Sequence, residues 1–200
     1  KGLVPFHKYD NVVVTAFEEH LYEAAKYAES KGVVKSHFTV GQDDKDKFES
    51  EFEKVKNRVE EKTGSKFEVS YSYQDPKTDT IAVDGENAPF RTEEGSMFFR
   101  PGGHGALIDN LNHQDADIIF IKNIDNVVIW ESLGDVADYK KMLAGKLLEL
   151  KDETFNLIKA LQNDPSEEVL KDASDFLTQK LFVKSLSGNE SAAEYIEKLD

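Results

Sequence analysis

The chain has 200 residues, of which 39% are hydrophobic, including 13 phenylalanines. This is enough apolar material for a globular core. Its 39 acidic residues outnumber 25 lysines and arginines, for a net charge of -14. So acidic a surface repels nucleic acid and anionic lipid, and neither is an expected partner. Cysteine is absent, which excludes disulfides and thiolate zinc sites.

No targeting or membrane segment is recognisable in the sequence. No apolar run approaches the roughly 20 residues that a membrane span requires. The opening residues 1–6 are too short for the apolar region of a signal peptide. We therefore expect a soluble, cytoplasmic protein, in which a phosphate ligand would need a local group of N–H donors or a metal ion.

The first part of the chain predicts a helix followed by a strand. Apolar residues recur at spacings of four, three and four, at Phe17, Leu21, Ala24 and Ala28. This spacing predicts an amphipathic helix over residues 16–31, which Gly32 can end. Residues 33–40 are rich in β-branched and aromatic side chains and favour a strand.

The same alternation then repeats. Asp43 and Asp44 can cap a second helix. One face of that helix carries Phe48, Phe52, Val55 and Val59. Thr63 and Gly64 predict its end. A strand is then predicted by the alternation of Phe67, Val69, Tyr71 and Tyr73.

The middle of the chain begins with a long segment that lacks periodicity. Residues 74–100 contain several turn dipeptides, but also six large apolar side chains that a disordered linker would lack. We interpret this segment as a functional loop. A short helix over residues 103–112 and a strand over residues 117–122 are predicted to follow.

This order of elements is typical of a three-layer α/β fold with a mostly parallel sheet. Ligands in such folds bind at the carboxyl ends of the strands. Gln74 and the segment Asn123-Ile124-Asp125 both follow predicted strands. We therefore expect them at one edge of the sheet, within an α/β domain over residues 1–130.

Residues 131–200 have a different character. Their apolar residues follow helical spacing in two stripes, separated by a break at Asp164-Pro165. We expect two or three helices that cover one flank of the sheet. Residues 191–200 have the pattern of a final helix without a stop signal, so we expect the natural protein to continue beyond them.

The segment Arg100–Ile108 carries the strongest candidate site. Gly102, Gly103 and Gly105 allow a backbone to approach a flat or anionic ligand, and a helix starting there directs free N–H groups at it. Asp125, just past a predicted strand, can hold a metal ion beside that ligand. Together these residues indicate a nucleotide site.

Each of these residues also has an ordinary structural explanation. The glycines can simply shape the entry to a helix, which His104 can cap. Asp125 and Asn126 can form an Asx turn after the strand. Gln74 can be a common polar residue at a strand end. The sequence leaves these alternatives open.

The order of five short motifs resembles a known family. They are Lys1-Gly2-Leu3-Val4-Pro5, His37-Phe38-Thr39-Val40, Gln74, Pro101-Gly102-Gly103-His104-Gly105 and Ile124-Asp125-Asn126. Each motif is individually weak, but together they resemble the UDP-sugar pyrophosphorylases, nucleotidyltransferases of the nucleotide-diphospho-sugar transferase fold.

Two further segments resemble a second family. Residues 78–83 and 99–107 are similar to a bacterial domain-of-unknown-function family of Bacteroides type.

The pyrophosphorylase resemblance implies a reaction between a nucleoside triphosphate and a sugar 1-phosphate, with Mg²⁺ as cofactor and a nucleotide or nucleotide sugar as ligand. It implies that Lys1 and Asp125 are catalytic, Lys1 by binding phosphate and Asp125 by binding the metal. It places Gln74 against the uracil edge and the turn from Gly102 to Gly105, with His104, against base and ribose.

The sequence also departs from that family. The glycine-rich loop that should precede Lys1 is not in this stretch, nor are the groups on the sugar side. We therefore expect no turnover from these 200 residues alone. Two alternatives remain, a non-catalytic nucleotide-sugar binding or regulatory domain and a glycosyltransferase. The second is disfavoured because Asn123 stands where an Asp-x-Asp motif needs its first aspartate. The oligomeric state is open.

Overall fold

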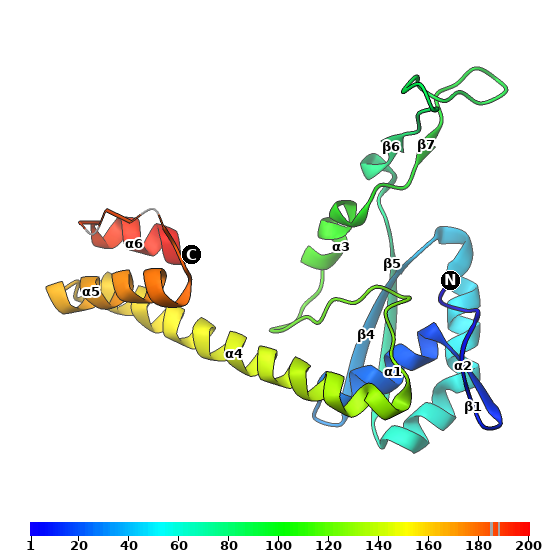
Figure 1. The fold of residues 1–200 in the computed structure, drawn as a ribbon, viewed down its shortest axis with the longest axis horizontal. Coiled ribbons are helices and arrows are strands. Elements are labelled where there is room, and N and C mark those ends of the chain that lie inside the picture. The colour runs from blue at the N-terminus through cyan, green and yellow to red at the C-terminus, as the bar shows by residue number, and fades with distance from the viewer. Residues whose placement is uncertain (185, 188) are drawn as a thin grey trace. The chain divides into compact units, whose positions relative to one another are not determined.

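A computed structural model describes residues 1–184, 186–187 and 189–200 (Figure 1). It divides into two compact units, Lys1–Asp138 and Tyr139–Asp200, which are described separately. The predicted α/β class is confirmed. In the described part of the chain, no helix is both long and apolar enough to cross a membrane.

The first unit is built on the strand pair β4 (Val33–Val40) and β5 (Lys66–Tyr73), which run parallel in register. Both strands were predicted. A two-residue strand, β3 (Glu29–Ser30), pairs antiparallel with the start of β4. The turn between them holds Lys31 and Gly32 at φ 54° and 81°. Gly32 therefore forms a hairpin turn, because turns of this kind need positive φ.

Two helices cover one face of the β4–β5 pair. They are α1 (Ala16–Tyr27) and α2 (Lys45–Thr63). The rings of Phe17 on α1 and Phe48 on α2 lie 4.8 and 6.4 Å from that of Phe38 on β4. The helix predicted over residues 16–31 is thus wrong at its end, because β3 needs the residues after Tyr27. The end of α2 at Gly64 is as predicted.

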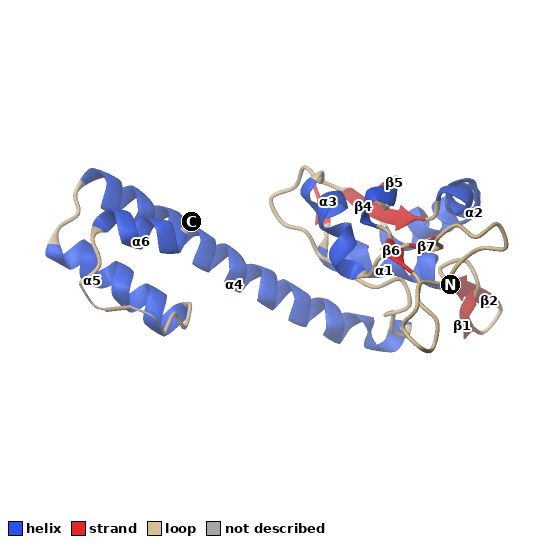
Figure 2. Cartoon of the chain, turned by 90° about the horizontal axis from the view of Figure 1, so that it is seen from above, coloured by secondary structure: helices blue, strands red, loops and turns tan. Residues whose placement is uncertain are grey.

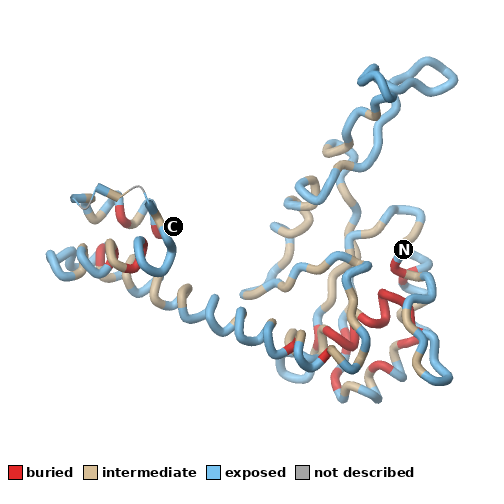
Figure 3. Tube along the Cα trace, viewed as in Figure 1, coloured by how far each residue is buried: buried red, intermediate tan, exposed pale blue. Residues whose placement is uncertain are grey.

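The core of this unit lies between these helices and the sheet (Figure 3). Its buried apolar residues are Val14, Phe17, Leu21, Tyr22, Val34, Phe48, Val55, Val59, Phe67 and Leu133. Burial of such side chains supplies the main driving force for folding.

The strand predicted over residues 117–122 is not formed. This segment runs along α1 instead, with Phe120 4.6 Å from the ring of Tyr27 and Lys122 bound to Glu23 at 2.9 Å. Alternate side chains therefore face a helix. Residues 117–122 keep the alternation of half-buried and exposed side chains that an extended chain has. In the described structure, however, they form no ladder of hydrogen bonds with a neighbouring strand.

A hairpin near the N-terminus was not predicted. Strands β1 (Pro5–Tyr9) and β2 (Val12–Thr15) pair antiparallel, and Asp10 turns the chain at φ 40° (Figure 2). The Thr15 side chain then accepts a hydrogen bond from the backbone N–H of Glu18, which caps α1.

The predicted loop over residues 74–100 contains a paired arm. Strands β6 (Thr80–Ile81) and β7 (Phe99–Arg100) pair antiparallel. Two isolated antiparallel bridges, Val83 with Pro89 and Arg91 with Met97, pair residues 89–91 with the two sides of this arm. The helix predicted over 103–112 is present as a 3₁₀ turn, His104–Leu107, followed by α3 (Ile108–Asn112).

The second unit is helical. Helix α4 (Trp130–Asn163) begins in the first unit and ends just before the predicted break at Asp164-Pro165. It is followed by α5 (Glu167–Asp175), a π-helical turn (Phe176–Lys180) and α6 (Ala192–Leu199). Their core consists of Leu161, Ala173, Phe176, Leu177, Tyr195 and Leu199.

Candidate functional site

Lys1 and Asp125 meet across 124 positions of sequence. The Nζ of Lys1 lies 3.1 Å from the Oδ2 of Asp125. A Cβ added to Gly2 would stand 2.9 Å from the side chain of Ile124 and 3.0 Å from that of Phe48, in the first turns of α2. The pair therefore lies near the start of α2, at the carboxyl end of β4.

The Lys1–Asp125 pair is open to solvent. Its side chains are 80% and 45% exposed. The lysine lowers the pKa of the Asp125 carboxyl by a hydrogen bond and by its charge. Asp125 is therefore ionised at neutral pH. An exposed pair of this kind contributes little to folding but leaves both charges accessible to a ligand.

Gln74 and the glycine turn also come together. The Nε2 of Gln74 donates to the Oγ1 of Thr78 at 3.0 Å. A Cβ added to Gly102 would stand 2.7 Å from the backbone oxygen of Thr78 and 3.5 Å from that Nε2. Only a glycine fits there, whereas Gly103 and Gly105 have open space around the Cβ position.

His104 begins the 3₁₀ turn after Gly103 and is exposed. It does not cap that helix, because the structure shows no side-chain hydrogen bond at its start. The 3₁₀ turn and α3 are only four and five residues long. Such short helices have weak dipoles, so the predicted binding of an anion at this helix start loses physical support.

Helix α3 is fastened to the end of β5. Lys77 lies 3.1 Å from Asp75, just after β5, and 3.3 Å from Asp109 on α3. The Nδ2 of Asn110 donates to the backbone oxygen of Tyr73 at 2.8 Å. These contacts bring the glycine turn to the carboxyl end of β5, where Gln74 lies. The roles assigned to these residues nevertheless stay predictions.

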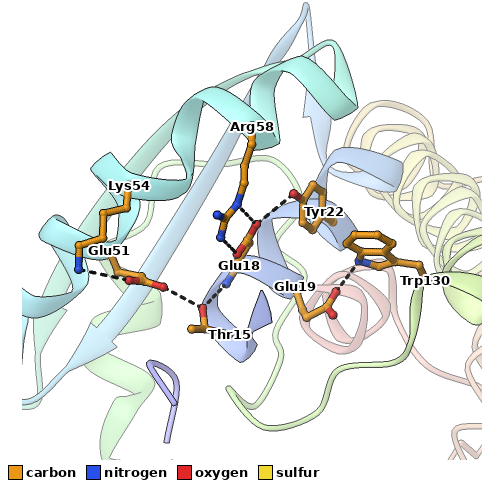
Figure 4. A network of polar contacts seen from close by, with 8 residues as sticks. All are labelled: Thr15, Glu18, Glu19, Tyr22, Glu51, Lys54, Arg58 and Trp130. Carbon is orange, nitrogen blue, oxygen red and sulfur yellow. Dashed lines mark hydrogen bonds and ion pairs between the residues drawn. The ribbon is translucent and has the colours of Figure 1, made fainter. Parts of the chain in front are cut away.

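The sequence did not reveal a row of buried glutamates on α1. Glu18, Glu19 and Glu23 are at most 1% exposed. Glu18 accepts two hydrogen bonds from Arg58, at 2.6 and 2.5 Å, and one from the Tyr22 hydroxyl at 3.0 Å (Figure 4).

The other two glutamates are also fully partnered. Glu19 contacts Nδ1 of His7 at 2.9 Å and accepts from the Tyr9 hydroxyl at 2.7 Å and the Trp130 indole at 3.0 Å. Glu23 accepts from Lys122 through both oxygens. A buried carboxylate needs such partners, and these account for its burial without a ligand.

A sequence signal for these glutamates is hard to find. Glutamate is common on exposed helix faces, and the partners come from β1, α2 and the 120s segment. Only the tertiary fold brings the glutamates and their partners together. The row therefore ties β1, α2 and the segment around Lys122 to α1.

The donor groups around Asp125 bear on metal binding. Among the residues described, no group of three or more histidine or acidic side chains could hold a metal ion. Asp125 contacts a lysine rather than a second carboxylate. A magnesium ion at Asp125 would thus need further oxygen ligands from a bound phosphate.

Comparison with known families gives one match. A family model described as a domain of unknown function, DUF4301, matches residues 1–199. The chain belongs to this family. The resemblance to a domain-of-unknown-function family is thereby confirmed, and the resemblance to UDP-sugar pyrophosphorylases stays a prediction. No curated protein and no solved structure matches the chain.

Proposed function

We propose that the full-length protein transfers a nucleotidyl group. A phosphate oxygen of a sugar 1-phosphate would attack the α-phosphorus of a nucleoside triphosphate, and the bond to the pyrophosphate leaving group would break. The observation that carries the proposal is the contact between Lys1 and Asp125. It supports the proposal because it joins a cation and an ionised carboxylate at the carboxyl end of a parallel strand.

The chemistry of this pair suits a metal-bound triphosphate. Mg²⁺ is usually held by one or two carboxylates together with substrate phosphates. Asp125 would hold the ion, and Lys1 would exchange its contact with Asp125 for one with a phosphate oxygen. When bound, the ion supplies charge neutralisation for the leaving pyrophosphate. Nucleotidyl transfer needs such positioning and no side-chain nucleophile.

The nucleoside would lie beside Gln74 and Gly102. The Gln74 amide can both donate and accept hydrogen bonds, as the edge of a base requires. The close fit of Gly102 against Thr78 supports a backbone that is held near this amide. The finer fold belongs to this proposal too: a three-layer, mostly parallel sheet of the nucleotide-diphospho-sugar transferase type.

A second candidate function is nucleotide-sugar binding without catalysis. It is favoured by one observation, since no cluster of metal-binding side chains surrounds Asp125 in the described part of the chain. The two candidates differ in whether pyrophosphate is released, so an activity assay separates them.

The test begins with binding. The melting temperature of the full-length protein would be measured with UTP, ATP, CTP, GTP and UDP-sugars, with and without Mg²⁺. We expect one nucleotide to raise it in a Mg²⁺-dependent manner. Asp125→Asn should abolish the dependence on Mg²⁺, whereas Asp117→Asn, an exposed aspartate eight residues earlier, should preserve it.

The outcomes separate the candidates. Release of pyrophosphate from the responding triphosphate and a sugar 1-phosphate supports nucleotidyl transfer. Binding without release supports the second candidate. The proposed site is wrong if Asp125→Asn and Asp117→Asn respond alike.

A further inference from the structure

The face of β4–β5 opposite α1 and α2 carries small polar side chains near its carboxyl end. The parallel register places His37 opposite Ser70 and Thr39 opposite Ser72. Side chains two residues apart on a strand share a face, so these four lie together. Parallel strands are normally covered by apolar layers on both faces, and a polar face here is unusual.

Hydrogen bonds join these side chains into one cluster. The two ring nitrogens of His37 lie 2.8 Å from the hydroxyls of Ser70 and Ser72. The Thr39 hydroxyl lies 3.2 Å from that of Ser72. From α3, Asn110 donates to the Ser72 hydroxyl at 2.8 Å. We call these five residues the hydroxyl cluster.

The hydroxyl cluster is uncharged. Burial lowers the pKa of the His37 imidazole below its ordinary value, so the ring is neutral at neutral pH. The strand residues that precede the cluster on this face, Lys35 and Glu68, carry opposite charges and lie opposite each other toward the amino ends of the strands. A phosphate would seek cationic donors, which the cluster does not contain.

The cluster adjoins the proposed nucleoside residues. Ser72 lies two residues before Gln74, and Asn110 also bonds the backbone of Tyr73 between them. Helix α3, which carries Asn110, directly follows the glycine turn. A ligand bound at Gln74 would therefore lie close to the hydroxyls of the cluster on β5.

We infer that the hydroxyl cluster binds the uncharged sugar ring of a nucleotide sugar. Hydroxyl, amide and neutral imidazole groups each pair with a sugar hydroxyl as donor or acceptor. Neighbouring hydroxyls of a sugar ring can engage two strand positions at once. This inference rests on the proposed function for its location, but its chemistry can be tested separately.

The first experiment observes the His37 ring nitrogens by NMR in the full-length protein. Glucose, glucose 1-phosphate and inorganic phosphate would be titrated in turn. We expect both glucose compounds to shift the His37 signals and inorganic phosphate to leave them unchanged. A response to inorganic phosphate alone overturns the inference.

The second experiment compares UDP-glucose with UDP in calorimetry. We expect UDP-glucose to bind more tightly, and Ser72→Ala or Asn110→Ala to reduce that advantage about fivefold, which one neutral hydrogen bond would supply. Ser50→Ala, which removes an exposed hydroxyl from α2, is the control and should retain the advantage.

The two proposals can fail independently. A His37 response to glucose without any binding of nucleotides would refute the proposed function and retain the sugar site. Equal affinities for UDP and UDP-glucose, together with no response to glucose, would refute the sugar site. If a variant lowers stability, the titration of His37 in the wild-type protein still tests whether the hydroxyl cluster binds a sugar.

Discussion

Polar side chains on the two sides of the β4–β5 pair differ in burial and in charge. On the helix-covered side, α1 buries Glu18, Glu19 and Glu23, and every carboxylate oxygen has a protein partner. On the open side, the hydroxyl cluster is neutral and partly exposed. The most buried charges are therefore the least available to a ligand.

The physical reason is the cost of desolvation. A carboxylate removed from water must be paired by nearby donors, and the pairing then consumes its binding capacity. Neutral hydroxyls at a surface exchange partners with water at little cost. Substitutions in the buried carboxylate pairs should therefore change stability more than substitutions at the exposed groups.

Loss of Arg58 should have the largest effect. Arg58→Met leaves Glu18, which is fully buried, with the Tyr22 hydroxyl as its remaining side-chain partner. We expect a loss of about 2–4 kcal/mol in the free energy of unfolding, measured by urea denaturation. Lys54→Met on the same helix, where Lys54 is 69% exposed, is the control and should cost far less. Equal losses in the two variants would contradict a structural role for Glu18.

Loss of Lys122 should be the next largest effect. Its side chain is 15% exposed and binds Glu23, which is 1% exposed. Lys122→Met should cost about 1–3 kcal/mol in the free energy of unfolding and should speed limited proteolysis by chymotrypsin after Phe120, whose ring packs on Tyr27. Lys47→Met, an exposed lysine on α2, provides the comparison. An unchanged rate of cleavage would mean that the pair does not hold this segment on α1.

The glycine turn gives a matched pair of substitutions. In Gly102→Ala the new Cβ would collide with the Thr78 carbonyl oxygen, whereas in Gly103→Ala it would meet nothing within 4 Å. We expect Gly102→Ala to cost about 1–2 kcal/mol and Gly103→Ala to be nearly neutral. Both are read from thermal unfolding. Similar melting temperatures for the two variants would show that the Thr78 carbonyl does not pack tightly against Gly102.

A smaller effect concerns pH. Burial lowers the pKa of His20 below the ordinary value of 6.5, although its hydrogen bond to the Ile124 carbonyl opposes this. The unfolded chain then binds a proton more readily than the folded one. Stability should therefore fall as pH drops below about 6.5 and level off below the folded pKa. In His20→Gln the fall should be shallower, and an identical pH profile would argue against the assignment.

The smallest effect on folding is expected at the proposed ligand site. Asp125→Asn removes a contact whose partner, Lys1, is 80% exposed. The unliganded melting temperature should not change measurably, because exposed ion pairs contribute little. A clear loss of stability would assign Asp125 a structural role like that of Glu18 and would weaken the proposed function.

Much of the fold around the candidate site could be predicted from periodicity. The spacing of Phe48, Phe52, Val55 and Val59 identified α2, and the alternation from Phe67 to Tyr73 identified β5. Gly64 marked a helix end because its φ of 75° suits glycine. Of the candidate site, the resemblance to UDP-sugar pyrophosphorylases implied that Lys1 and Asp125 act together, and the structure places them in contact.

The rest depended on neighbours that local patterns do not specify. Residues 117–122 read as a strand, yet a strand needs a partner edge, and this segment packs on α1 instead. The alternate positions of β5 already showed serines between aromatics, but only the register with β4 placed them beside His37.

Local patterns in the chain were enough to locate the helices α1, α2 and α3 and the strands β4 and β5, apart from the end of α1, because periodicity and glycine stops act within a few residues. Which polar side chains are buried in ion pairs and which stay exposed depends on packing between distant segments. In the sequence, the glutamates on α1 cannot be told from exposed ones, because their partners Arg58, Trp130 and Lys122 lie in distant segments. Burial depends on the packing of the whole chain, and the free-energy cost of desolvation requires that each buried carboxylate has partners.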